Sequence, residues 1–137
     1  MNTPAQNKQL VHYVFTELAE GNSQPLVAHM ANDVRWVITG RSAWSQTWVG
    51  KEAVVHNLFG LLRERIAGRI RIVPRRLVAD GDTVVVEARG ANTTRDGAFY
   101  DNSYCWVIRL QDGQIKELRE YADTEFMTRA LGAPLAA

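Results

Sequence analysis

The chain has 137 residues, of which 46% are hydrophobic and 23% charged, and its formal net charge is +1. This length and composition predict one compact globular domain. The balanced charge argues against a general nucleic-acid or membrane-surface binder. A single cysteine, Cys105, excludes an internal disulfide, and no apolar run is long enough to span a bilayer. We therefore expect a cytoplasmic protein, with one domain over residues 1–132 and a loose tail over residues 133–137.

The first part of the chain is dominated by helix signals. Thr3-Pro4-Ala5-Gln6 has the form of a capping box with proline at the first helical position, and apolar residues follow at helical spacing as far as Leu18. A shorter helix is expected after Ser23, and a third between Gly50 and Gly68. An early strand is expected over residues 33–39, between the second and third helices.

Extended segments dominate the rest, with strands expected over residues 69–79, 83–93, 102–110 and 114–122. Pro74 marks a sheet edge or a bulge because it has no N–H to donate. Gln111-Asp112-Gly113 between two apolar runs indicates a hairpin, and a short helix is expected from Thr124 to Gly132. This order predicts an α+β fold, in which a curved mixed, mostly antiparallel sheet wraps around three N-terminal helices and encloses a conical cavity.

The last strand carries an unusual carboxylate. Alternate residues of a strand share a face, so Leu118, Glu120 and Ala122 are expected to point the same way. A carboxylate on an apolar face is costly to bury unless it is paired or functional. We expect Glu120 to face the cavity with a raised pKa, because its apolar neighbours disfavour the charge.

Three segments resemble the nuclear-transport-factor-2-like superfamily: the Gly50-Lys51-Glu52-Ala53-Val54 helix start, the Asp112-Gly113-Gln114-Ile115 turn and the Arg119-Glu120-Tyr121-Ala122-Asp123-Thr124 ending. Within it the chain is most similar to SnoaL-like polyketide cyclases, which are related to ketosteroid isomerases and limonene epoxide hydrolases. The resemblance covers nearly the whole chain and implies a cystatin-like α+β barrel. The superfamily contains isomerases, cyclases, hydrolases, dehydratases and non-catalytic binders, so the resemblance alone assigns no reaction.

The residues that act in the isomerases are not retained at the matching positions. Their general-base aspartate, at the end of the first strand, corresponds to Ile38. Their oxyanion tyrosine on the first helix corresponds to Val14, and their second oxyanion donor falls near Trp106, whose indole N–H can donate a hydrogen bond but cannot act as an acid.

The epoxide hydrolases suggest a different set of residues. Their aspartate–arginine–aspartate cluster corresponds to Glu120 and, in reversed order, to Glu87 and Arg89. We expect these three to meet in the cavity, where Arg89 would hold one carboxylate ionised and the other would act as acid or base. Tyr104 would donate a hydrogen bond. A buried ion-pair network that only fixes strand register is an equally good interpretation of the three residues.

Aromatic and apolar side chains are expected to line the same cavity and to suit a flat apolar ligand, aromatic or polycyclic. They are Trp36, Ile38, Trp44, Trp48, Phe59, Asn102, Trp106 and Leu118. Core packing is the alternative role for Trp36 and Phe59. Trp44 and Trp48 lie in a polar loop and are expected to cover a ligand mouth or a partner subunit.

These features predict a cofactor-free small-molecule enzyme of the SnoaL-like type, acting by general acid–base chemistry as an isomerase, cyclase or hydrolase. The alternative is a non-catalytic ligand-binding or dimerisation module. No metal is expected, because the three histidines lie on separate predicted helices without ligand spacing. The basic run from Arg63 to Arg76 is expected to be a solvated face, and no nucleic-acid or membrane partner is expected.

A homodimer is expected to form through the convex face of the sheet. We place Cys105, Val107, Arg119 and Tyr121 there, together with Val84, Val86 and Ala88 from the adjacent strand. So large an apolar patch is unfavourable in water, and its mixed composition is typical of an interface centre. Superfamily members commonly pair through this face, which agrees with a two-fold dimer.

Overall fold

A computed structural model describes residues 2–134. Helices α1 (Pro4–Ala19) and α2 (Gln24–His29) precede strands β1 (Met30–Ile38) and β2 (Thr47–Val49). A π-helical segment, η1 (Ala53–Leu58), continues into α3 (Phe59–Arg65). The remaining elements are β3 (Ile66–Ala67), β4 (Ile72–Asp80), β5 (Thr83–Gly90), β6 (Asn92–Thr94), β7 (Phe99–Tyr100), β8 (Ser103–Gln111), β9 (Gln114–Ala122) and α4 (Thr124–Leu131).

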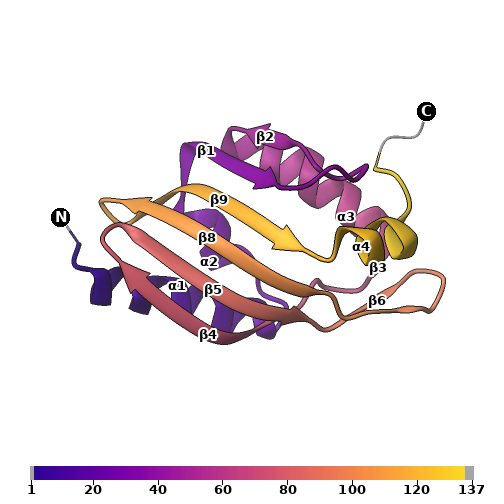
Figure 1. The fold of residues 1–137 in the computed structure, drawn as a ribbon, viewed down its shortest axis with the longest axis horizontal. Coiled ribbons are helices and arrows are strands. Elements are labelled where there is room, and N and C mark those ends of the chain that lie inside the picture. Colours follow the sequence, from indigo (N-terminus) through magenta and orange to yellow (C-terminus); the bar gives the residue numbers. More distant parts are fainter. Residues whose placement is uncertain (1, 135–137) are drawn as a thin grey trace.

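The main sheet has six strands in the order β2-β1-β9-β8-β5-β4. The β1–β9 pair is parallel and the other pairs are antiparallel, so the sheet is mixed and mostly antiparallel. Helices α1, α2 and α3 lie on one side of this sheet (Figure 1). A smaller sheet, β3-β6-β7, lies at one end. The α+β fold with N-terminal helices is therefore confirmed.

Local sequence signals account for several element ends. The Thr3 hydroxyl accepts from the Gln6 N–H, and the Gln6 side chain accepts from the Thr3 N–H, which completes the predicted capping box. Asp112 and Gly113 both have positive φ, 51° and 78°, as a two-residue hairpin turn requires. The register of the edge strand β4 shifts just after Pro74, as its missing N–H predicts.

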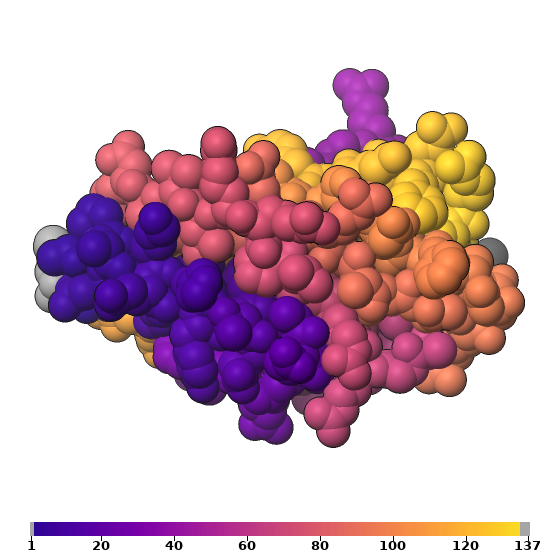
Figure 2. Space-filling view, turned by 90° about the horizontal axis from the view of Figure 1, so that it is seen from below, coloured from indigo at the N-terminus to yellow at the C-terminus, as the bar shows by residue number. Residues whose placement is uncertain are grey.

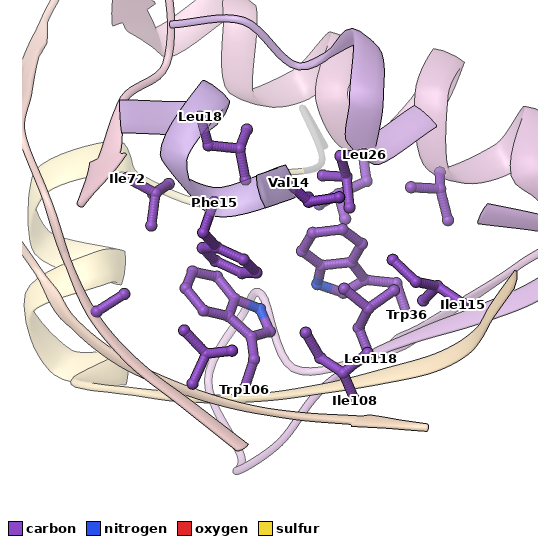
Figure 3. Packing of buried hydrophobic residues seen from close by; sticks show 14 of the residues in the cluster. Val14, Phe15, Leu18, Leu26, Trp36, Ile72, Trp106, Ile108, Ile115 and Leu118 are labelled. Atoms are coloured by element: carbon purple, nitrogen blue, oxygen red, sulfur yellow. The ribbon is translucent and has the colours of Figure 1, made fainter. Parts of the chain in front are cut away.

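The core lies between the sheet and α1. Figure 3 shows the Trp36 and Trp106 side chains pointing from the sheet towards α1, with Phe15 of α1 close to Trp106. The Phe15 and Trp106 ring centroids are 5.5 Å apart, and the two indoles meet edge to face at 6.4 Å. Such aromatic pairs stabilise the fold beyond the free energy gained by burying their apolar surface. They hold the two tryptophans that shape the site described below.

The predicted orientation of β5 is wrong. Val84, Val86 and Ala88 are buried and share the core face of the sheet, where Val86 pairs with Trp106. Their neighbours, including Val85, point outwards. A shift of one residue exchanges the two faces of a strand, and the expected convex patch contained this error. The convex face instead has a row in which Val85 pairs with Val107 and Val107 pairs with Arg119.

The homodimer stays a prediction, now centred on that row. Val107→Arg is expected to shift a dimer towards monomer, because it places a new positive charge beside Arg119 and its symmetry mate. Tyr13→Arg is the control, since Tyr13 is an exposed residue of α1, 52% accessible and away from the sheet's convex face. Light scattering at micromolar concentration reads the result. An unmodified protein that is monomeric there refutes the dimer.

Within residues 2–134 no helix is long and apolar enough to cross a membrane. Of the predicted tail, residues 135–137 lie outside the described residues. The carbonyl groups of Ala133 and Pro134 accept hydrogen bonds from Arg65.

Candidate active site

A cavity of about 460 Å³ lies between the sheet and the helices. This volume falls in the usual range for sites that bind small molecules, about 300–1,000 Å³. Most of its lining is apolar. Of the predicted site residues, the structure brings together Trp36, Ile38, Trp44, Phe59, Tyr104, Trp106, Leu118 and Glu120.

Among the described residues, Glu120 is the one carboxylate that lines the cavity, and it is only 5% exposed. In the sheet it lies between Ile38 of β1 and Trp106 of β8. Two indole N–H groups donate to the same oxygen, Oε1, from Trp36 at 3.0 Å and from Trp106 at 3.2 Å. Among residues 2–134 no donor bonds to Oε2. One oxygen is therefore fixed and the other is left for a ligand.

Burial raises the pKa of Glu120 from its ordinary value of 4.5 to about 7, while the hydrogen bonds from Trp36 and Trp106 oppose the rise. The cause is desolvation, because a low-dielectric site disfavours the charged form. Near neutral pH both forms of the carboxyl group are populated. That is the condition under which one group can both accept and donate a proton.

The indole bonds make a direct prediction about this pKa. Trp106→Phe removes one donor to the carboxylate and is expected to raise the pKa of Glu120 further, by about one unit for a bond to a charged group. Trp44→Phe is the matched control, because the Trp44 indole donates to the Gly132 carbonyl instead. The measurement is an NMR titration of the Glu120 carboxyl carbon in each variant. An unchanged pKa in Trp106→Phe would show that the bond does not act on the charge.

Two tyrosines extend the polar part of the site. The Tyr104 ring stacks on Trp106, with centroids 4.6 Å apart. The Tyr100 hydroxyl accepts from Asn102 Nδ2 at 3.0 Å and also has the Tyr104 hydroxyl as a hydrogen-bond partner. Burial raises the pKa of Tyr100 to about 12 and that of Tyr104 well above its ordinary value, so both remain protonated donors.

Tyr100 lines the cavity and was missed by the sequence analysis. A hydroxyl has two acceptor positions and one proton. Because Asn102 Nδ2 donates to the Tyr100 oxygen, that bond does not use the Tyr100 proton. Asn102 does not line the cavity. It is buried, and its Nδ2 positions Tyr100 by donating to the tyrosine hydroxyl. No clear signal in the sequence pointed to Tyr100, because it lies in β7, which is separated from β8 by residues 101 and 102 and belongs to the smaller sheet.

Glu87 and Arg89 do not reach the cavity, so the predicted cluster with Glu120 is wrong. Both lie on the outward face of β5, with side chains 55% and 51% exposed. Glu87 pairs with Arg76 at 3.2 Å, and Arg89 pairs with Asp101 at 3.0 Å. Glu120 consequently has indole donors in place of the expected arginine.

The two loop tryptophans have different positions. Trp44 is fully buried and lines the cavity, and its indole donates to the Gly132 carbonyl at 2.6 Å, which ties the loop to the end of α4. The Arg65 guanidinium lies 5.5 Å from the centre of its ring. Trp48 is buried opposite Trp36 in the β1–β2 ladder and is not among the cavity's lining residues. Trp48 thus packs in the core.

The positions that serve catalysis in the isomerases are apolar in the structure. Ile38 lines the cavity and has no ionisable group. Val14 is buried, whereas the neighbouring Tyr13 is exposed and is not among the cavity's lining residues. Among the described lining residues, Glu120 is therefore the group that can change its protonation near neutral pH, and the two tyrosines can act as hydrogen-bond donors. Within the described part of the chain, His, Cys, Asp and Glu side chains form no group of three suited to a metal ion, and the expected absence of a metal stays a prediction.

Comparison with known proteins supports a family assignment. A model of the SnoaL-like domain matches residues 11–118 of the chain. No curated protein matches it.

Several solved structures have the same fold. One is an NTF2-like protein of unknown function from Burkholderia pseudomallei K96243, with 22% identity, coverage of 93% of this chain and 98% of that one, and a TM-score of 0.78. Another, from Jannaschia sp. CCS1, is a proposed SnoaL-like polyketide cyclase, with 23% identity, 98% and 99% coverage and a TM-score of 0.77. A third is TerC, co-crystallised with polyporic acid, with 20% identity, 94% and 98% coverage and a TM-score of 0.76.

Proposed function

Because the chain belongs to the SnoaL-like domain family of the NTF2-like superfamily, we propose that it is a small-molecule enzyme with Glu120 as its general acid–base group. The substrate would be an apolar molecule, aromatic or polycyclic, held in the cavity. One observation carries the proposal: Glu120 is buried, lines the cavity, and has Oε1 fixed by two indoles while Oε2 is free. The crystal of TerC with polyporic acid supports a small-molecule ligand for this fold.

The reaction class that fits best is proton transfer at a carbon next to a carbonyl group. Ionised Glu120 would remove the proton through Oε2, so the C–H bond breaks and its electron pair forms an enolate. The Tyr100 hydroxyl would donate a hydrogen bond to the enolate oxygen, as in oxyanion stabilisation. Protonated Glu120 would then return the proton to another carbon in an isomerisation. In a cyclisation the enolate carbon would instead attack a second carbonyl carbon of the substrate, whose C=O π bond opens to an alkoxide, and protonated Glu120 would give its proton to that oxygen.

Hydrogen exchange tests this proposal without knowledge of the natural substrate. The probe is 2-tetralone, a bicyclic aromatic ketone with acidic α-hydrogens, incubated in D₂O and followed by proton NMR. The protein is expected to accelerate exchange over buffer alone, and Glu120→Gln is expected to remove the acceleration. Binding of the probe is followed separately by quenching of tryptophan fluorescence, since Trp36 and Trp106 line the cavity.

The alternative is a non-catalytic ligand-binding protein. It is favoured by the apolar residues, Ile38 and Val14, at the positions of the isomerases' base and oxyanion donor. If 2-tetralone quenches the tryptophans but its exchange is not accelerated, the binding function is supported and the enzymatic one is refuted.

A further inference from the structure

The charged groups at the cavity suggest what kind of ligand enters it. Of the residues that the structure describes, three with charged side chains line the cavity: Glu120, Arg63 and Arg69. Glu120 is almost fully buried, whereas both arginines are exposed, so the acid lies inside and the cations lie at the solvent side. Two exposed lining residues, Ser23 of the α1–α2 connection and Gln24 at the start of α2, lie on the same side. The cavity therefore opens between this connection and the segment that follows β3.

The packing around Gly21 holds one of these arginines at the opening. Gly21 has a φ of +82°, and a Cβ built on it would lie 3.0 Å from Arg69 Cβ, so the absence of a side chain there lets Arg69 lie against the turn. The Arg71 guanidinium carbon is 3.5 Å from the same point and adds a third positive charge nearby. In Figure 2 the indigo N-terminal helices lie beside the pink segment around residue 70.

Within the described part of the chain the charges at the opening have no carboxylate partner, and Arg63 Nη2 donates to the neutral Val55 carbonyl at 3.5 Å. Among residues 2–134 no carboxylate forms a salt bridge with Arg63 or Arg69, whereas Arg76 and Arg89 each have one. Cations at the mouth of a low-dielectric cleft attract anions and raise their local concentration. An anionic group is less favourable inside the cavity than at its mouth, because ionised Glu120 would repel it there.

We propose that the ligand is an apolar organic acid, bound as its anion with the acidic group at Arg63 and Arg69 and the apolar body directed towards Glu120. The proposal rests on the proposed function in that both use the same cavity. It restricts the substrate class to amphipathic anions whose reactive carbon lies away from the acidic group. It also assigns part of the basic run, expected from the sequence to be solvated, to ligand binding.

Two dyes of the same ring system test it. The first is 8-anilinonaphthalene-1-sulfonate, an anion, and the second is N-phenyl-1-naphthylamine, which lacks the sulfonate; both fluoresce more strongly in apolar sites. The double variant Arg63→Gln/Arg69→Gln is expected to weaken binding of the sulfonate about tenfold and to change binding of the neutral dye less than about twofold. Added salt is expected to weaken only the sulfonate, because the arginines are exposed.

Two control variants separate charge at the mouth from charge in general. The double variant Arg63→Lys/Arg69→Lys keeps both charges and is expected to keep most of the sulfonate's affinity. Arg109→Gln removes an exposed charge from β8, away from the cavity lining, and is expected to change neither dye. Equal effects of the double glutamine variant on both dyes, or no effect on the sulfonate, would overturn the proposal.

Failure of this proposal and failure of the enzymatic function give different results. Suppose that the neutral dye binds and 2-tetralone exchange is accelerated, but the affinity for the sulfonate dye is the same with and without the two arginines. Then only the proposed preference for anions is wrong. If exchange is not accelerated but the sulfonate depends on the arginines, the cavity is an anion-binding site without the proposed chemistry, and the present inference is supported.

Discussion

Glu120→Gln is expected to lower the rate of exchange or turnover at least about 100-fold, the usual contribution of a general acid–base group. Glutamine has nearly the same shape, and its carbonyl oxygen can accept the two indole bonds that reach Oε1. It cannot take up or release a proton near neutral pH. The variant should therefore fold and bind the probe while losing the chemistry, which separates the catalytic role from a structural one.

Glu87→Gln provides the matched control for this experiment. Glu87, like Glu120, is a glutamate within a strand of the main sheet, but it lies half-exposed on the outward face of β5. Its replacement is expected to leave the rate close to that of the unmodified protein. A Glu120→Gln protein that binds 2-tetralone and retains more than about a tenth of the rate would contradict a general acid–base role for Glu120.

The second large effect concerns stability. The pKa of Glu120 is raised by burial to about 7, above the ordinary value of 4.5 that it has in the unfolded chain. Between these two pH values the folded protein keeps the proton and the unfolded chain releases it. Stability therefore falls as pH rises through this window, and the fall is complete above the folded pKa. The shift corresponds to about 3 kcal/mol.

Urea denaturation of the unmodified protein and Glu120→Gln at several pH values measures this effect. The free energy of unfolding of the variant, relative to the unmodified protein, is expected to increase by about 3 kcal/mol between pH 4.5 and pH 8. Glu87→Gln, which replaces a half-exposed carboxylate on the outward face of β5, is measured alongside as the control for removal of a carboxylate outside the cavity. A difference between Glu120→Gln and the unmodified protein that stays constant over this range would mean that Glu120 titrates alike in the folded and unfolded states.

Much of the fold could be predicted because local chemistry fixes the ends of its elements. The capping box at Thr3 and the Asp112-Gly113 turn depend on only a few neighbouring residues, so they can be predicted without tertiary information. The turn alone does not give the final register of β8 against β9, because a bulge between Arg109 and Leu110 shifts the pairing so that Trp106 lies opposite Glu120. The face of Glu120 instead follows from alternation within β9, since Leu118 and Ala122 on the same face are apolar. The central residue of the site was predicted for this reason.

The face of β5 was harder to predict. Its run Val84-Val85-Val86 has no alternation of apolar and polar residues, and this leaves the inward face undefined. The comparison with epoxide hydrolases then favoured Glu87 and Arg89 as the inward residues. In the structure Ala88, which lies between them, is the buried residue. A short range of sequence cannot decide such a register, because it depends on which side chains the helices cover.

Other differences also arise from tertiary packing. Trp48 lies in β2, a strand of only three residues within what the sequence indicates to be a loop. The expected strand over residues 83–93 is divided between β5 and β6 at Ala91, next to Asn92, whose side chain bonds the Arg71 backbone on both sides. The position of Arg69 at the cavity opening depends on its contact with Gly21, nearly fifty residues away in the chain.

The measurement that tests the central claim most directly is a carbon-13 NMR titration of the Glu120 side-chain carboxyl, assigned by comparison with Glu120→Gln. The buried position of this group predicts a pKa of about 7 in the folded protein. Such a value would mean that the carboxyl group exchanges a proton at neutral pH inside the cavity. A pKa at the ordinary value of 4.5 would contradict the assignment of Glu120 as the acid–base group.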